Sequence, residues 1–183
     1  MDKQIDYLLK SGIAKRSTTA YGCQGFMVPK KGPGDYRMVT NFTSLNLGLI
    51  PETFPSPDAE TILSSAAGNK YFVNIDCTSG FFQILMHEDS IKYLGFSFYR
   101  EMMAFNVLPQ GLSCSPGIFQ SYMQLMLEDM IKEKQALVYA DDITLVANTE
   151  DQLIERNRKL MTRLKEYNIF KKILLSVNLC VIK

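Results

Sequence analysis

The sequence predicts an α+β fold, in which hairpin-paired strands form an antiparallel sheet and helices cover one of its faces. Two observations predict it. Short apolar segments rich in β-forming residues occur in pairs around turn residues, as the strands of a hairpin do. Apolar residues after Ser115 recur at the spacing of one helix face. The segments run in the order helix, hairpin, connector, helix, strand, hairpin, helix, hairpin and helix, which favours a layered α+β arrangement.

The composition is that of a globular protein with a real core. Of the 183 residues, 46% are hydrophobic and 21% are charged, which suits one domain, alone or with a small lobe. No apolar segment approaches the roughly 18–20 residues of a membrane span, and the N-terminus does not resemble a signal peptide. We therefore expect an intracellular protein, in the cytoplasm or nucleus, with no membrane partner. The cysteines are scattered without metal-ligand spacing and are expected as free thiols: Cys23, Cys77, Cys114 and Cys180.

Basic residues are concentrated in the N-terminal part of the chain. Residues 1–50 hold seven Lys and Arg against three Asp, a net charge of +4, so the remainder carries −3 of the chain's total of +1. This asymmetry fits phosphate contacts beside a carboxylate site, and it fits an ordinary scatter of surface charge equally well.

The N-terminal half is predicted to contain a helix, a hairpin, a connector, a second helix and a core strand. The first helix has its apolar side chains on one face and Gly12 as its stop. The hairpin has strong turn chemistry between its strands, and three prolines keep the connector extended. In order, the elements are a helix over 2–10, strands over 25–29 and 36–39, the connector 50–57, a helix over 58–67 and a strand over 71–75 that leads directly into Asp76.

The C-terminal half is predicted to contain two hairpins and two helices. Ser115 and Pro116 are typical of an N-cap and a first helical position, and apolar residues follow at helical spacing up to Met130. We interpret the methionines among them as core residues. Thr149 and Gln152 have the spacing of a capping box at the start of the last helix. The hairpins pair 96–98 with 102–105, and 136–138 with 143–146.

The tip of the last hairpin carries two adjacent carboxylates, in Tyr139-Ala140-Asp141-Asp142. A simple turn is one interpretation, because Asp caps backbone donors in turns. Adjacent carboxylates in apolar surroundings also repel each other, and a divalent cation would relieve that cost. If the strand ending at Asp76 is a neighbour in the same sheet, three carboxylates converge in the oxygen-rich setting that Mg²⁺ prefers. Two such ions about 4 Å apart would suit an in-line phosphoryl displacement.

Four sequence blocks carry a further signal, because they occur in a fixed order and at fitting separations. They are 28–31 with 36–42 and 45–46, then 74–84, then 108–111 with 115–116 and 118–120, and finally the tetrapeptide Tyr139–Asp142. Together they resemble the fingers and palm of a reverse transcriptase, an RNA-directed DNA polymerase, as in the pol proteins of gypsy-type retrotransposons and retroviruses. The resemblance implies a polymerase palm with part of the fingers: fingers over 1–57, palm over 58–168 and a divergent, truncated segment over 169–183.

The resemblance implies a metal site at the matching carboxylates. Asp76 and Asp141 would be the principal ligands of two Mg²⁺ ions, with Asp142 in support. The backbone carbonyl of Cys77 would complete one coordination shell. Mn²⁺ is an alternative metal.

The resemblance also implies a binding site for the incoming dNTP. Lys30 and Arg37 would clamp its triphosphate, with Lys31 as the alternative to Lys30. Phe81 would crowd a ribose 2′-hydroxyl and so select deoxynucleotides. Without the resemblance, the basic residues are a solvated hairpin tip, and Phe81 is a core residue.

The remaining implied contacts involve the template and the primer. Gln110 would contact the template or the incoming nucleotide, and Gly111 would permit a close backbone approach there. Tyr139 and Ala140 would lie next to the primer terminus.

The implied function is nucleotidyl transfer from a dNTP to a primer 3′-hydroxyl on an RNA or DNA template, within a pol polyprotein. The alternative is a catalytically silent retroelement remnant that at most binds nucleic acid or a protein. It arises because we expect no counterpart here of the primer grip, thumb, connection or ribonuclease H. An RNA-dependent RNA polymerase palm is the third possibility, but such palms usually carry Gly-Asp-Asp instead of Tyr-Ala-Asp-Asp.

Overall fold

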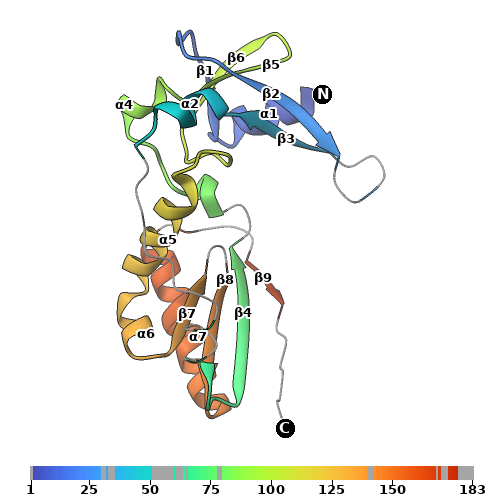
Figure 1. The fold of residues 1–183 in the computed structure, drawn as a ribbon. Coiled ribbons are helices and arrows are strands. Elements are labelled where there is room, and N and C mark those ends of the chain that lie inside the picture. The colour runs from blue at the N-terminus through green and yellow to red at the C-terminus, as the bar shows by residue number, and fades with distance from the viewer. Residues whose placement is uncertain are drawn as a thin grey trace. The chain divides into compact units, whose positions relative to one another are not determined.

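The structure is a computed structural model, and it describes residues 2–29, 32, 36–50, 60, 64, 66–77, 80–139, 142–167, 169 and 173–176. The chain forms two compact units (Figure 1). The first unit combines residues 1–51 with 81–115, and the second combines residues 52–80 with 116–183. Residues 81–115 thus join the N-terminal segment, an interleaving that a single division at residue 57 does not anticipate.

The first unit is built on a five-stranded mixed sheet with the order β1-β6-β5-β2-β3. The two hairpins that the sequence predicts, β2–β3 and β5–β6, are both present. The β5–β6 hairpin inserts between β1 and β2, which run in the same direction, so β2 and β5 pair in parallel while the other pairs are antiparallel. The strands are β1 (Ala14–Arg16), β2 (Cys23–Pro29), β3 (Tyr36–Asn41), β5 (Gly95–Phe98) and β6 (Glu101–Phe105).

One apolar core holds the first unit together. The rings of Phe96 and Phe105 stack with their centroids 4.4 Å apart, and the ring of Phe42 lies 6.2 Å from that of Phe105. The predicted N-terminal helix is present as α1 (Asp2–Lys10) and buries Leu8 in this core. Two short helices belong to the same unit, α2 (Thr43–Gly48) and α4 (Glu88–Ile91). A 3-10 turn, η1 (Gly80–Gln83), starts where the chain crosses between units.

The second unit is built on a four-stranded antiparallel sheet with the order β7-β8-β4-β9. Its strands are β4 (Tyr71–Cys77), β7 (Ala136–Tyr139), β8 (Asp142–Ala147) and β9 (Ile173–Ser176). Alternate residues of the two central strands are buried: Val73, Ile75, Cys77, Ile143 and Leu145. Between them, Asn74 and Thr144 are half-buried and polar. One face of these strands is therefore apolar, while the opposite face carries polar side chains at Asn74 and Thr144 and the buried Val146 further along β8.

Helices α5 (Ser115–Met126), α6 (Glu128–Lys132) and α7 (Glu150–Glu166) belong to the second unit, and α7 lies against β8 and β4 (Figure 1). The predicted apolar stripe is buried except at Tyr122, which is half-buried, and this confirms that its methionines are core residues: Phe119, Met123, Met126, Leu127 and Met130. The stripe does not lie on one continuous helix. At Leu127, a φ of −108° and a ψ of 16° separate α5 from α6.

The helix starts differ in detail from the prediction. Ser115 lies inside α5 instead of capping it, and its buried hydroxyl donates to the carbonyl of Pro109 at 2.7 Å. Thr149 caps α7 as predicted, because its hydroxyl accepts a hydrogen bond from the Gln152 N–H at 3.3 Å. The Gln152 side-chain oxygen accepts a hydrogen bond from the N–H of Asn148 at 3.1 Å. A capping box would instead use the N–H of the N-cap residue, Thr149.

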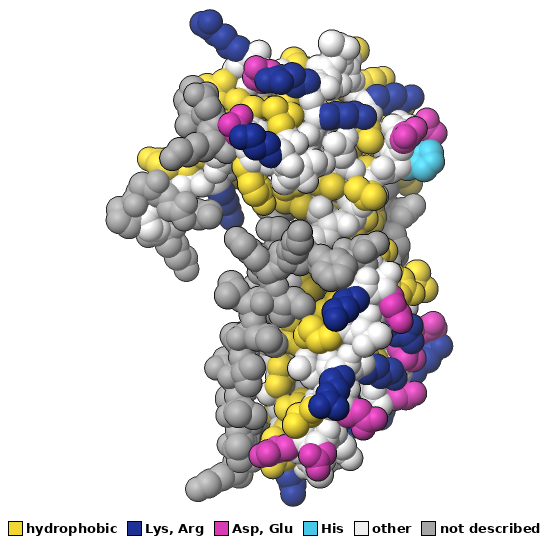
Figure 2. All heavy atoms as spheres, turned by 180° about the vertical axis from the view of Figure 1, so that it is seen from behind, with side chains coloured by type: hydrophobic (Ala, Val, Ile, Leu, Met, Phe, Trp, Pro, Cys, Tyr) yellow, Lys and Arg dark blue, Asp and Glu magenta, His cyan; other side chains and the backbone are white. Residues whose placement is uncertain are grey.

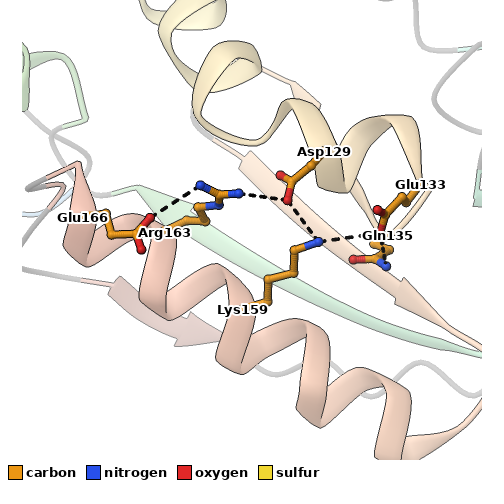
Figure 3. A network of polar contacts seen from close by, with 6 residues as sticks. All are labelled: Asp129, Glu133, Gln135, Lys159, Arg163 and Glu166. Carbon is orange, nitrogen blue, oxygen red and sulfur yellow. Dashed lines mark hydrogen bonds and ion pairs between the residues drawn. The ribbon is translucent and has the colours of Figure 1, made fainter.

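A network of charged side chains joins α6 to α7 (Figure 3). Asp129 lies 3.1 Å from Lys159 and 3.0 Å from Arg163, and these two cations also approach Glu133 and Glu166. Figure 2 shows acidic and basic side chains interspersed in the lower part of the face that it draws. The network therefore pairs Lys159 and Arg163 of α7 with carboxylates and ties the two helices together.

Some predicted segments lie largely outside the described residues. Of the predicted helix over 58–67, the described residues 60, 64 and 66 are helical, and the connector is described only at Ile50. The described cysteines, Cys23, Cys77 and Cys114, form no disulfide, and Cys180 lies outside the described residues. Among the residues that the structure describes, no helix combines the length and the apolar character needed to cross a membrane.

Candidate active site

The end of β4 and the start of β8 bring two of the predicted carboxylate positions together. In the antiparallel register of these strands, Asp76 is the direct partner of Asp142. On the other side of β8, Asp142 is also the partner of Tyr139, the last residue of β7. Directly opposed residues share one face of a sheet. The three positions therefore lie side by side at one end of the sheet.

A polar network leads to Asp142 along β4 and β8. Asn74 Nδ2 donates to Asp142 Oδ1 at 3.4 Å, and Thr144 Oγ1 donates to Asn74 Oδ1 at 3.3 Å. Because its oxygen accepts from Thr144, the Asn74 amide is oriented with its donor toward the carboxylate. Asp142 is also exposed, so this carboxylate keeps oxygen lone pairs available to a cation from solvent.

The other predicted metal ligands are only partly described. Cys77 is the last residue of β4, and its side chain is buried. The predicted ligand at this position is the backbone carbonyl and not the thiol. Asp141, Ala140 and the side chain of Asp76 lie outside the described residues. Within the described ranges, no three His, Cys, Asp or Glu side chains gather closely enough to hold a metal ion. The structural support for the site is thus the strand register and the surroundings of Asp142.

The predicted triphosphate clamp falls on the β2–β3 hairpin of the first unit. Arg37 is the second residue of β3, where it pairs with Val28 and exposes its side chain. Lys30 and Lys31 lie outside the described residues. An exposed guanidinium close to the end of a hairpin is suited to bidentate binding of a phosphate.

Gln110 and Gly111 are exposed residues of the loop between β6 and α5, whose neighbouring residues Leu108 and Leu112 are buried. Gly111 has a φ of +102°, which residues with a side chain rarely adopt, and an added Cβ would meet the carbonyl oxygen of Thr40 at 3.4 Å. Phe81 is half-buried in η1, which is compatible with both interpretations of this residue.

The sequence reasoning did not identify two asparagines that contact site residues. Asn74 carried a local signal, since it stands two residues before Asp76 and therefore on the same face of β4. Asn46 hydrogen bonds to the loop of Gln110, but its partner Gly111 is 65 residues away, so no local pattern could reveal the contact.

Comparisons with known proteins agree on one family. A family model described as reverse transcriptase (RNA-dependent DNA polymerase) matches residues 28–172. The retrovirus-related Pol polyprotein from transposon opus of Drosophila melanogaster is 38% identical over 176 residues, which is 92% of this chain and 17% of that protein. The corresponding polyprotein from transposon 297 of the same organism is 31% identical over 173 residues, or 92% of this chain and 16% of that protein. The chain thus spans about a sixth of the length of these relatives.

Solved structures give the same result. The structure of the foamy viral protease-reverse transcriptase in complex with RNA/DNA hybrid matches 91% of this chain and 22% of that chain, with a TM-score of 0.80 and 26% identity. The structure of the same kind of protein in complex with dsDNA matches 91% of this chain and 34% of that chain, with a TM-score of 0.81 and 26% identity.

Proposed function

The chain belongs to the reverse transcriptase (RNA-dependent DNA polymerase) family, and from this premise we propose that it is the RNA-directed DNA polymerase domain of a retrotransposon pol polyprotein. It would transfer a nucleotidyl group from a dNTP to a primer 3′-hydroxyl on an RNA or DNA template. The predicted fold class, an α+β polymerase palm, is confirmed by the structural match over 91% of the chain. The observation that carries the functional proposal is the pairing of Asp76 with Asp142 beside Tyr139.

The residues at this end of the sheet fit a divalent cation. Carboxylate oxygens are preferred ligands of Mg²⁺, and Asp142 is exposed next to the position of Asp76. In this proposal Asp76, Asp141 and Asp142 hold Mg²⁺, for which Mn²⁺ can substitute, and the carbonyl of Cys77 adds a ligand. When bound, such ions lower the pKa of an attacking hydroxyl and neutralise charge on the phosphates.

The dNTP would be held by residues of the β2–β3 hairpin and two further positions. Arg37 and Lys30 donate to the triphosphate, which orients the α-phosphate and offsets the negative charge that moves to pyrophosphate as it leaves. Phe81 packs against the sugar and leaves no room for a 2′-hydroxyl. Gln110 contacts the nucleotide or the template base.

The template and primer are the remaining proposed partners. Two matched reverse transcriptases were solved with an RNA/DNA hybrid and with dsDNA, which supports a duplex ligand for this chain. Gly111 would lie by the template, and Tyr139 and Ala140 by the primer terminus. We assign the first unit, residues 1–51 with 81–115, to the fingers and the second unit to the palm. Compared with the predicted fingers over 1–57, this assignment adds residues 81–115 and gives residues 52–57 to the palm.

Primer extension tests the proposal. The chain is incubated with a DNA primer on an RNA template, dNTPs and Mg²⁺, beside the variants Asp76→Asn, Asp141→Asn and Asp142→Asn. Glu155→Gln, which changes an exposed carboxylate of α7, serves as the matched control. We expect extension by the wild type and by Glu155→Gln, and a loss of about 10²-fold or more in the aspartate variants, because removing a group that stabilises the transition state has effects of that size.

The outcomes separate an active domain from a silent remnant. Equal incorporation by the wild type and Asp142→Asn would overturn the assignment of the carboxylates. The same assay is run on a chimera in which the chain continues into the segment that follows the matched region of the opus polyprotein. Extension by the chimera alone would favour the silent alternative for the isolated chain. Ribonucleotide use by Phe81→Val tests the sugar gate, and an unchanged preference for dNTPs counts against it.

A further inference from the structure

The loop that carries Gln110 and Gly111 is held by a side chain from another part of the sequence. Asn46 of α2 donates from Nδ2 to the carbonyl oxygen of Gly111 at 3.0 Å. The Oδ1 of the same amide accepts from the backbone N–H of Ser113 at 2.9 Å. Both ends of one amide thus bind one loop, at backbone groups on either side of Leu112. Two hydrogen bonds fix the orientation of the loop backbone relative to the amide, whereas a single hydrogen bond would allow the loop to rotate about it.

The base of this contact is rigid. Phe42, directly before α2, is buried in the core of the first unit, and its carbonyl accepts from the Asn46 N–H at 2.8 Å. The loop lies close to the same segment, because a Cβ on Gly111 would be 3.5 Å from the ring of Phe42. At the far end of the loop, the buried hydroxyl of Ser115 donates to the Pro109 carbonyl at 2.7 Å. Gln110 therefore stands on a loop that is fastened at both ends.

We propose that Asn46 is a positioning residue of the polymerase site, which fixes the loop backbone at Gly111 and Ser113 and so aims Gln110 at the nucleotide or template. This inference rests on the proposed function. Asn46 itself touches no reacting group in this proposal. Its part is to keep Gly111 at a positive φ and Gln110 exposed in one conformation, so that binding a nucleotide does not have to order the loop.

The chemistry of the contact explains why an asparagine stands there. The amide supplies one donor and one acceptor at a fixed separation, and the loop offers one carbonyl and one N–H. Asp at this position would keep the acceptor for Ser113 but place a carboxylate against the Gly111 carbonyl. Ala would lose both bonds. The two substitutions therefore dissect the contact, and Asp is expected to be no better than Ala for the orientation of Gly111.

The kinetic test compares Asn46→Ala with Asn106→Ala. Asn106 is also half-buried in the first unit, at the start of the same β6–α5 connection, but its Nδ2 donates to the carbonyl of Gly12 at 3.1 Å and not to Gly111 or Ser113. We expect Asn46→Ala to raise KM for dNTP about tenfold with kcat less affected, since the two lost hydrogen bonds together contribute a net free energy of that order. Asn106→Ala should leave KM unchanged. In a Gln110→Ala background the effect of Asn46→Ala should disappear, because both changes act through one loop.

Amide hydrogen exchange gives a readout that needs no activity. The Ser113 N–H should exchange faster in Asn46→Ala than in the wild type and in Asn106→Ala. Unchanged exchange at Ser113, or an equal KM increase in both asparagine variants, would overturn the positioning role. A wild-type chain that incorporates no nucleotide, together with faster exchange at Ser113 in Asn46→Ala, would overturn the proposed function while supporting the hold of Asn46 on the loop.

Discussion

Asp76 and Asp142 are direct partners across the antiparallel pair of β4 and β8, so the sheet places two acidic residues opposite each other. Like charges in this arrangement destabilise a sheet, and a bound cation reverses the effect. We therefore expect Asp142→Asn to raise the free energy of unfolding by about 0.2–1 kcal/mol in EDTA, the range for such cross-strand pairs. In Mg²⁺ we expect the wild type to be more stable than Asp142→Asn, because binding of the ion stabilises the folded wild type and not this variant.

Urea unfolding in EDTA and in excess Mg²⁺ measures both effects. Glu155→Gln is the control, since it removes an equal charge from an exposed position of α7. This variant should respond to Mg²⁺ as the wild type does. An equal Mg²⁺ response in Asp142→Asn and the wild type would show that Asp142 does not contribute to an ion site.

Asn74 is expected to tune the ion affinity of the neighbouring carboxylate. Its amide is held by Thr144 and donates to Asp142, an arrangement in which the donor orients a metal ligand. Asn74→Ala should raise the Mg²⁺ concentration at half-saturation about tenfold, as loss of such supporting contacts does elsewhere. Thr144→Val keeps the side-chain volume and removes only the orienting hydroxyl, so its effect should be smaller. A Mg²⁺ titration of unfolding midpoints gives the affinities, and an unchanged midpoint in Asn74→Ala would contradict the role.

The ion pairs between α6 and α7 make stability depend on acid pH. Desolvation acts to raise the pKa of the Asp129 carboxyl, but hydrogen bonds from Lys159 and Arg163 outweigh it and lower the pKa from 3.8 to about 2. Because the folded pKa lies below the unfolded value, the contribution is complete above pH 3.8 and is lost as the pH falls toward 2. The Asp129 side chain is 35% exposed, so solvent screening limits this contribution to about 0.5–1 kcal/mol.

Asp129→Asn removes the contribution of the ionised carboxylate to the free energy of unfolding. The variant should be less stable than the wild type at neutral pH and equal to it near pH 2, as measured by urea unfolding across the range. Glu128→Gln is the control, because its partner Lys132 is largely exposed and the pair contributes little. A constant difference between Asp129→Asn and the wild type at all pH values would show that the carboxylate's ionisation is not the cause.

The sequence predicted what depends on local pattern. The correct elements follow from the strand pairs around turn residues and from the apolar stripe after Ser115. Strand alternation and helical periodicity both depend on residues that are close in sequence. The partnership of Asp76 with Asp142 could be anticipated only as a condition, that their strands be neighbours, and the register meets it. The resemblance to reverse transcriptases supplied the substrate, which no spacing alone could have done.

The features that were not predicted depend on tertiary packing. Strand β9 pairs with β4 through residues 173–176, and its partner lies far back in the sequence, at residues 74–77. The β5–β6 hairpin inserts between β1 and β2, so that β5 pairs with β2 in parallel. Local hairpin patterns predict only antiparallel pairs of neighbouring strands. The break at Leu127 likewise falls inside a good helical pattern, so the periodicity alone does not predict it.

Gly80 sits where the chain leaves the carboxylate strand, and it must lack a side chain. An added Cβ would lie 2.6 Å from Cζ and 2.8 Å from Cε2 of Phe119, a fully buried ring of α5, and 3.4 Å from the Cβ of Cys77. The ring cannot swing away without opening the core. We expect Gly80→Ala to lower the free energy of unfolding by about 1–3 kcal/mol, the usual cost of overpacking.

Gly48→Ala is the matched control, because nothing lies within 4 Å of an added Cβ there. It should change stability little. Phe119→Leu removes the two ring atoms that the new methyl would strike, so Gly80→Ala should cost less in that background than in the wild type. Denaturant unfolding of the four proteins of this double-mutant cycle gives the coupling energy, which we expect to reach about 1 kcal/mol or more for groups in contact. A coupling near zero would mean that the strain at Gly80 comes from the backbone after Cys77 and not from the ring.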